Sequence, residues 1–189
     1  MAVILAVALC AIGFDVAPAS KPSASKRWFY ILEGVGTAGI TIDQSTDQDV
    51  IATLGPNYET ITHNQYSVEL KYAELGLSFY YCLKNKQKKI FDIVVDYGTT
   101  SKGITIGEST LKDIYDQYGK EDDTGTCSPQ SCVYEYKGVQ FLVESQTKIV
   151  DEQAVIEPSQ MKVVRIDIVA PDKSSNFCDG FDREEKKEP

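Results

Sequence analysis

The sequence is poor in histidine and in positive charge. His63 is its only histidine, and 19 Lys and Arg stand against 28 Asp and Glu, which gives a formal net charge of -9. A single histidine excludes a multi-histidine metal centre, and the cysteines lack the Cys-x-x-Cys spacing of a zinc site. The shortage of cations argues against nucleic acid and anionic membrane surfaces, because both are bound through clustered Lys and Arg. We therefore expect no metal, no cofactor and no nucleic-acid partner.

The chain has one long uncharged run, at its N-terminus. Residues Met1–Phe14 carry no charge, but a helix of that length spans roughly 21 Å, short of a bilayer core of about 30 Å. Ala17-Pro18-Ala19 places small residues at the positions that a signal peptidase reads. We interpret residues 1–19 as a signal peptide and 20–27 as a linker, although no basic residue precedes the apolar run. The prediction is an extracytoplasmic protein, periplasmic or secreted, with no membrane span after cleavage.

Cysteine is scarce, and its count agrees with export. Removing residues 1–19 removes Cys10 and leaves an even number, namely Cys82, Cys127, Cys132 and Cys178. Four cysteines allow three pairings. The segment between Cys127 and Cys132, Ser-Pro-Gln-Ser, is typical of turns, so a short-range disulfide is geometrically easy there. Cys82 then pairs with Cys178. The alternative is a cytosolic protein with four reduced cysteines in its core.

One segment of the chain recurs 64 residues later. Gly39–Gly55 aligns without a gap on Gly103–Gly119, and eight of the seventeen positions are identical. We interpret this as a tandem duplication, with one unit at residues 28–96 and the other at 97–170.

The repeated segment predicts a short helix in each unit. Thr46 with Asp49, and Thr110 with Asp113, fit a capping box, in which the threonine oxygen and the carboxylate each accept an orphan backbone N–H. We expect helices over 46–54 and 110–118. Gly55 and Gly119 follow where a helix C-cap favours glycine.

Alternation of apolar and polar residues after each helix predicts strands. They are expected over 66–72, 77–83 and 89–95, then over 132–136, 139–144 and 161–169, with a polar insert at 145–160. The fold class is therefore α+β, with two repeated units, each a short helix packed on an antiparallel β-meander. The other face of each meander has no predicted cover. Residues 171–189 form a charged tail.

The repeated segment resembles a unit of known families. Ile106-Gly107, the cap pair Ser109-Thr110, Ile114 and Gly119 are similar to the repeated unit of the β-lactamase inhibitor proteins. They also resemble the single unit of the small outer-membrane assembly lipoproteins, the SmpA/OmlA group. In the first unit Asp43 stands in place of the glycine. The resemblance implies a helix-plus-meander fold over most of residues 28–170, and a binder or assembly factor in place of an enzyme.

Three possible catalytic or metal sites have simpler structural explanations. Ser109 lacks the second glycine of a nucleophile elbow and fits helix capping. His63 is a lone histidine in an expected loop. Asp43, Asp47 and Asp49 lack the glycine and the terminal glutamate of a helix-loop-helix calcium site. We predict no catalytic residue and no metal site.

The expected function is that of an exported protein-binding module, either an inhibitor or an envelope assembly factor. Its partner is then another exported or envelope protein. Tyr80, Tyr134 and Tyr136 are the predicted binding residues, because aromatic anchors dominate interfaces and we assign these three to the outward set of each meander. His63 and the acidic run at 121–123 are not favoured. Two alternatives are a self-associating structural domain of the envelope, and a secreted enzyme whose carboxylate pair meets only in the fold.

Overall fold

The computed structural model describes residues 27–63, 65–120, 124–128, 130–144, 147–150, 153–171 and 178. The predicted signal peptide 1–19, the linker up to residue 26, the acidic run 121–123 and the tail at 172–177 and 179–189 lie outside the described residues.

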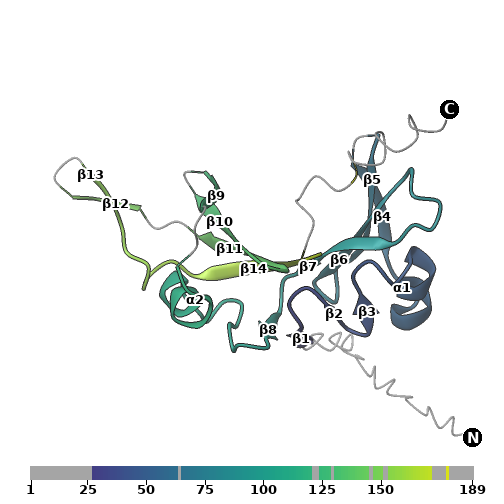
Figure 1. Ribbon diagram of the computed structural model, residues 1–189, viewed down its shortest axis with the longest axis horizontal. Coiled ribbons are helices and arrows are strands. Elements are labelled where there is room, and N and C mark those ends of the chain that lie inside the picture. Colours follow the sequence, from purple (N-terminus) through teal and green to yellow (C-terminus); the bar gives the residue numbers. More distant parts are fainter. Residues whose placement is uncertain are drawn as a thin grey trace, which may run out of the picture.

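One antiparallel sheet of eight strands forms the body of the protein (Figure 1). In spatial order its strands are β4 (Glu59–His63), β5 (Ser67–Tyr72), β6 (Leu77–Cys82), β7 (Ile90–Val95), β14 (Val163–Val169), β11 (Val139–Glu144), β10 (Ser131–Tyr136) and β9 (Thr124–Cys127). The six predicted strands are confirmed as β5, β6, β7, β10, β11 and β14. The outermost strands, β4 and β9, were not predicted.

Shorter elements complete the fold. β1 (Phe29–Ile31) pairs in parallel with β8 (Gly98–Thr100), and β2 (Gly36–Thr37) pairs with β3 (Ile40–Thr41). β12 (Thr147–Val150) and β13 (Gln153–Ile156) form a hairpin inside the predicted polar insert. The helices are α1 (Asp47–Leu54) and α2 (Leu111–Tyr118). A mostly β protein with two short helices agrees with the predicted α+β class.

Both helices begin with the predicted capping box. The side chain of Thr46 accepts the backbone N–H of Asp49, whose carboxylate accepts the N–H of Thr46 at 2.8 Å. Thr110 and Asp113 make the same pair of bonds, with the second at 2.7 Å. The predicted helices and their cap residues are therefore confirmed.

Removing either cap threonine is expected to destabilise the protein. Thr46→Ala and Thr110→Ala should each lower the free energy of unfolding by about 1 kcal/mol, because an orphan helix N–H loses its acceptor. Urea denaturation followed by circular dichroism measures this. The exposed helix residues Thr53 and Gln117 provide matched alanine controls. Equal stability of cap and control variants would contradict the capping role.

The core lies on one face of the eight-stranded sheet. Cross-strand pairing places Phe79 opposite Ile93, Ile93 opposite Ile168, and Val139 opposite Ile168, and all four side chains are fully buried. Val50 of α1 and Ile114 of α2 are buried against this face. The buried apolar side chains of β5, β6, β7, β10, β11 and β14 on this face belong to one continuous core.

The first and second meanders join edge to edge. β7 and β14 pair with Ile166 opposite Val95 and Ile168 opposite Ile93, so neither strand is an open edge. An unpaired strand of this apolar composition would be prone to pair with another chain. Pairing within the molecule removes that liability.

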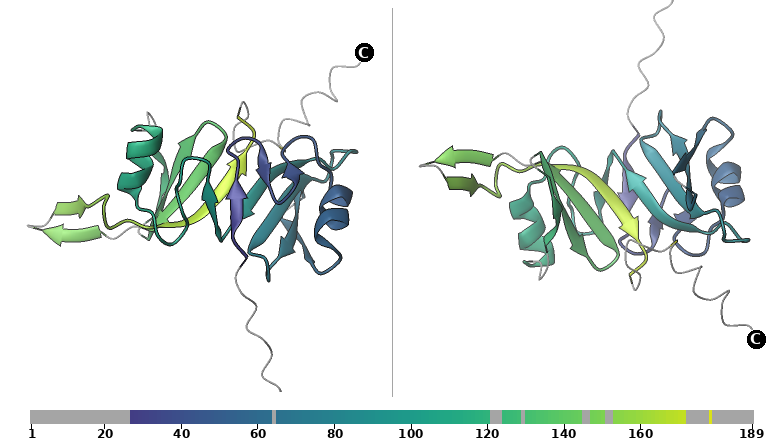
Figure 2. Two further views of the ribbon diagram at one scale, coloured as in Figure 1. Left: turned by 90° about the horizontal axis from the view of Figure 1, so that it is seen from below. Right: turned by 90° about the horizontal axis from the view of Figure 1, so that it is seen from above.

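Neither α1 nor α2 lies on the opposite face of the sheet. In Figure 1, α1, α2, β1 and β8 lie below the sheet, and the strands at its two ends, β4–β5 and β9–β10, rise above the central strands. Figure 2 shows the same face from above, with the strands in front of the helices. We call this surface the open face.

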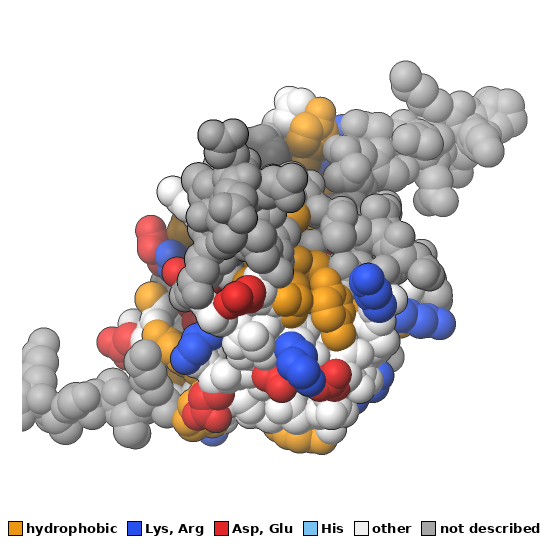
Figure 3. Space-filling view, turned by 90° about the vertical axis from the view of Figure 1, so that its left-hand side faces the viewer, with side chains coloured by type: hydrophobic (Ala, Val, Ile, Leu, Met, Phe, Trp, Pro, Cys, Tyr) orange, Lys and Arg blue, Asp and Glu red, His pale blue; other side chains and the backbone are white. Residues whose placement is uncertain are grey.

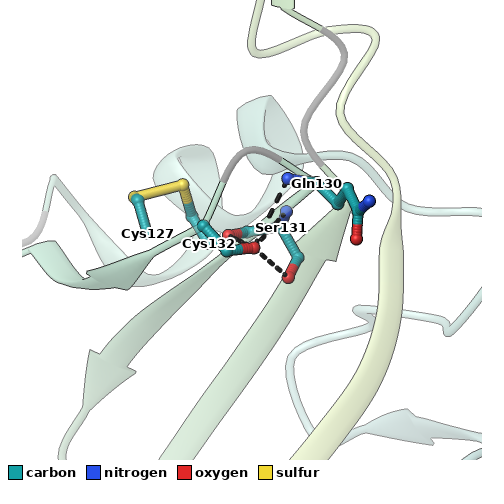
Figure 4. The surroundings of a disulfide bond; sticks show 5 residues. Cys127, Gln130, Ser131 and Cys132 are labelled. Atoms are coloured by element: carbon teal, nitrogen blue, oxygen red, sulfur yellow. Dashed lines mark hydrogen bonds between the residues drawn. A yellow bond between two sulfur atoms is a disulfide. The ribbon is translucent and has the colours of Figure 1, made fainter.

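Two disulfides are present, with the predicted pairing. Cys82 at the end of β6 is bonded to Cys178, 96 residues later. Cys127 and Cys132 face each other across the β9–β10 hairpin, where their Cα atoms are 4.1 Å apart (Figure 4). Ser128 N–H donates to the Ser131 carbonyl at 2.8 Å and closes the turn. Among the described residues, no helix has the length and apolar character needed to cross a membrane.

Candidate functional site

Side-chain alternation places a row of polar groups on the open face. Tyr80 of β6 lies opposite Glu69 of β5 and Asp92 of β7, and its neighbours Phe79 and Tyr81 point into the core. Arg165 and Asp167 project from β14 on the same face. We call Glu69, Tyr80, Asp92, Arg165 and Asp167 the polar centre.

Only one of the three predicted binding tyrosines lies on the open face. Tyr80 is half-buried there, whereas Tyr134 is 3% exposed and packs edge-to-face against Tyr115 of α2. The outward assignment of Tyr134 and Tyr136 is therefore wrong. The physical reason is register: Tyr134 lies opposite the core residue Phe141, which places Val133 and Glu135 outward.

Tyr136 supports the end of a helix. Its hydroxyl donates to the carbonyl of Gly119 at 2.9 Å, and its ring packs against Tyr118 and Phe141. This tyrosine therefore has a structural role beneath α2.

Glu69 is buried but fully engaged. Its carboxylate lies 2.7 Å from Nε2 of His63 and also accepts hydrogen bonds from Ser78 and Tyr80. Burial alone would raise the pKa of Glu69, but the bonds from Ser78 and His63 hold that pKa below its usual value. Burial and the nearby carboxylates of Glu69 and Asp92 raise the pKa of Tyr80, so its hydroxyl remains a donor.

Arg165 neutralises Asp167. The guanidinium donates from Nε at 2.8 Å and from a terminal nitrogen at 2.9 Å to the two carboxylate oxygens. Asp167 is 8% exposed. Burial raises its pKa, and the charge of Arg165 opposes that effect. A bidentate ion pair of this kind fixes the orientation of both side chains on the open face.

Asp92 is the unusual member of the polar centre. Among the described residues, its Oδ1 atom is the one buried side-chain oxygen or nitrogen without a hydrogen-bond partner. Burial, helped by the negative charge of Asp167, raises the pKa of Asp92 from 3.8 to about 8. At neutral pH this carboxyl is therefore mostly protonated, because the charge of Arg165 and a backbone hydrogen bond from Ile93 only partly offset the cost of burying its charged form.

Residues considered as catalytic or metal-binding on sequence grounds have structural partners. Ser109 Oγ accepts the N–H of Thr105 at 3.0 Å, in the turn before α2. Asp49 belongs to the capping box, and Asp47 pairs with Lys88 at 3.3 Å. Within the described residues, no three His, Cys, Asp or Glu side chains are grouped as metal ligands.

The end of the molecule near α2 offers a weaker candidate. A shallow depression of about 340 Å³ lies beside the start of α2, between Lys102, Glu108 and Gln117. Figure 3 shows this end of the molecule, where acidic and basic side chains of the described residues are interspersed. Such a surface does not favour a ligand of either charge.

A short apolar stripe lies on the outer side of β1. Trp28, Tyr30 and Leu32 are 54%, 62% and 43% exposed, while the alternate residues Phe29 and Ile31 are buried. The stripe is exposed, but nothing in the described structure covers it or indicates what would.

The polar centre was not predicted from the sequence, although a signal exists. Asp92 and Asp167 each interrupt an apolar strand, as Phe91-Asp92-Ile93 and Ile166-Asp167-Ile168. A charge at such a position must lie on the face opposite the core, and each strand alone indicates this. The pairing of β7 with β14, which brings the two carboxyl groups together, is visible only in the fold.

Comparison with known proteins gives little guidance. No protein-family model matches the sequence, and no curated protein matches it. One solved structure is similar: a DUF4309 family protein, YjgB, from Bacillus subtilis subsp. subtilis str. 168, with a TM-score of 0.43 and 17% sequence identity. The match covers 70% of this chain and 82% of that one.

Proposed function

We propose that this chain is an exported protein-binding module, an inhibitor or an envelope assembly factor, which binds its partner on the open face of the sheet. The observation that carries the proposal is Tyr80, a half-buried aromatic residue on a face that neither α1 nor α2 covers. Aromatic residues surrounded by partly buried polar groups are typical of interface hot spots. The partner is another exported or envelope protein.

We also propose that the sheet arose by tandem duplication of two helix-plus-meander units. Equivalent hydrogen bonds recur at a spacing of 64 residues. The hydroxyl of Tyr72 donates to the Gly55 carbonyl, as Tyr136 does to Gly119, each at 2.9 Å. In the sheet order, β4–β7 precede β14 and β9–β11, so each unit contributes four adjacent strands. The relation to the β-lactamase inhibitor and SmpA/OmlA units stays a prediction.

Two disulfides support the proposed extracytoplasmic location. Disulfides persist in oxidising compartments and are rare in cytosolic proteins, where thiols are kept reduced. The long bridge, Cys82–Cys178, also ties the C-terminal part of the chain to β6. An export route would supply the oxidant that both bonds need.

The absence of an evident catalytic arrangement at the polar centre favours binding over catalysis. Asp167 is held by Arg165, and Glu69 by His63, Ser78 and Tyr80, so neither is a free base or nucleophile in the described structure. The alternative of a secreted enzyme with a carboxylate pair would need Asp92 to act with a second acid. Asp92 has a pKa suited to a general acid, and for that reason a hydrolase assay on glycosides is the appropriate control.

Truncating Tyr80 tests the binding proposal. The mature chain, immobilised and incubated with a culture or envelope fraction, should retain one exported protein in a fixed ratio. Tyr80→Ala should weaken that complex by more than about 1 kcal/mol, because a central aromatic anchor is lost. Calorimetry with the isolated partner measures the loss.

Tyr30→Ala is the matched control, since Tyr30 is an exposed tyrosine of β1, a strand that lies on the helix side of the sheet (Figure 1). Circular dichroism of both variants checks that they are folded. Retention of no exported protein, or equal affinity of the Tyr80 variant and the wild type, would refute binding through the open face. Capture of only further copies of this chain would favour the self-associating alternative.

A further inference from the structure

We propose that the polar centre receives a lysine side chain of the partner protein, whose ammonium group pairs with Asp92. This inference rests on the proposed binding function and specifies the chemistry of its central contact.

Asp92 is the unsatisfied acceptor of the polar centre. The two oxygens of Asp167 each accept a bond from Arg165, and Glu69 accepts from Ser78, Tyr80 and His63. Oδ1 of Asp92 is buried and has no partner. A buried polar atom without a partner costs free energy, and a ligand that supplies the missing bond recovers it. A single unpaired oxygen suits the compact charge of an ammonium group better than a guanidinium, which donates two parallel hydrogen bonds.

The charges around Asp92 favour a cation. Asp92 lies opposite Tyr80 of β6, which in turn lies opposite Glu69 of β5, and the charges of Arg165 and Asp167 of β14 act on it. Asp96 follows the end of β7, where the charges of Arg165 and of Lys71 on β5 act on it. His63 on β4 lies behind Glu69. Apart from Asp92 itself, the three carboxyl groups of Glu69, Asp96 and Asp167 outnumber the two permanent cations, Arg165 and Lys71. An anionic ligand would meet net repulsion here, and the described residues include no group of three metal ligands.

Lysine binding should displace the proton of Asp92. With a pKa of about 8, the carboxyl is mostly protonated at pH 7. An ammonium group at hydrogen-bond distance stabilises the carboxylate, so its pKa falls and a proton leaves to solvent as the ion pair forms. The flexible four-carbon stem of lysine gives its compact ammonium group reach toward this carboxyl.

The first test uses a small probe with the full folded chain. Nα-acetyl-lysine amide is titrated against protein carrying ¹³C-labelled aspartate, and the Asp92 carboxyl resonance is followed by NMR. Three matched probes define the chemistry: the lysine probe, its Nε-acetylated neutral analogue, and Nα-acetyl-arginine amide. Binding is measured at pH 7 in two buffers of different ionisation enthalpy, which gives the number of protons released.

The expected result is selective binding of the lysine probe. Its addition should shift the Asp92 resonance and release up to about one proton per bound probe. Asp92→Asn should bind it about tenfold more weakly and release none, because the neutral amide accepts a weaker bond. Asp116→Asn, which removes an exposed carboxylate on α2 that is not part of the polar centre, should behave like the wild type. Equal binding of the neutral analogue, tighter binding of the arginine probe, no shift at Asp92, or undiminished binding by Asp92→Asn would each overturn the inference.

A second arm separates this inference from the proposed function. The wild-type chain and the Asp92→Asn variant are compared as baits for the same exported partner. If both retain it equally, the lysine contact is refuted while the binding function stands. If the wild type retains no partner, the binding function itself fails. Acetylation of the partner's lysines should abolish retention by the wild type, and unchanged retention would also refute the lysine contact.

Discussion

Replacing both Cys82 and Cys178 by alanine is expected to lower the free energy of unfolding by about 4 to 5 kcal/mol. The bond closes a loop of 96 residues, and constraining a loop of about that size reduces the entropy of the unfolded chain by this amount at 25 °C. Total stabilities of single domains are about 5 to 15 kcal/mol. This bond therefore supplies a large share of the stability.

The short disulfide provides an internal comparison. Cys127 and Cys132 are only 5 residues apart, so their replacement by alanine should cost about 2 kcal/mol on the same basis. Guanidinium denaturation of both double variants, monitored by tryptophan fluorescence and circular dichroism, measures the two losses. A cost for the Cys82–Cys178 pair no greater than that for the hairpin pair would contradict the loop-entropy explanation.

Local signals in the sequence were sufficient for the helices, for six of the eight strands of the main sheet and for the disulfides. A capping box depends on residues three apart, and Thr46 with Asp49 specifies it without any help from the fold. The turn between Cys127 and Cys132 is equally local. Once Cys127 and Cys132 were paired across that turn, Cys82 and Cys178 were the two cysteines that remained, so their pairing was deduced by elimination.

Features that depend on contacts between distant strands were not predictable in the same way. Val95 of β7 and Ile166 of β14 are 71 residues apart in the sequence yet lie opposite each other in the centre of the sheet. Their pairing joins what the sequence suggested as two separate meanders. It also brings Asp92 and Asp167 to one face, which is why the polar centre escaped sequence analysis.

The internal repeat indicates the correct sheet face for Tyr134 and Tyr136. Strand register is weakly fixed by alternation alone, since a shift of one residue exchanges the two faces. Continuing the 64-residue alignment through the strands places Tyr134 over Leu70 and Tyr136 over Tyr72. Leu70 and Tyr72 are core residues, 3% and 2% exposed. The alignment therefore assigns the two tyrosines to the helix-covered face.

Asp92→Asn is expected to stabilise the protein in alkaline solution and to have little effect near pH 4. The carboxyl of Asp92 has a pKa near 3.8 when unfolded and about 8 when folded. Between these two values the folded state binds more protons than the unfolded state, so stability decreases as pH rises through this window. Asparagine resembles the protonated acid in shape and cannot ionise, so it avoids this loss.

The size of the effect follows from the pKa shift. Each pKa unit corresponds to about 1.4 kcal/mol, so the stability advantage of the variant should grow with pH and reach several kcal/mol by about pH 9. Urea denaturation of wild type and variant at intervals from pH 4 to pH 9 measures the difference, in which other titrating groups largely cancel. Asp116→Asn, an exposed aspartate on α2 paired with Lys112, is the matched control and should show a small, nearly constant difference. A pH-independent difference for Asp92→Asn as well would mean that Asp92 is solvated in the folded protein, and the carboxyl would then have no need of a cationic partner.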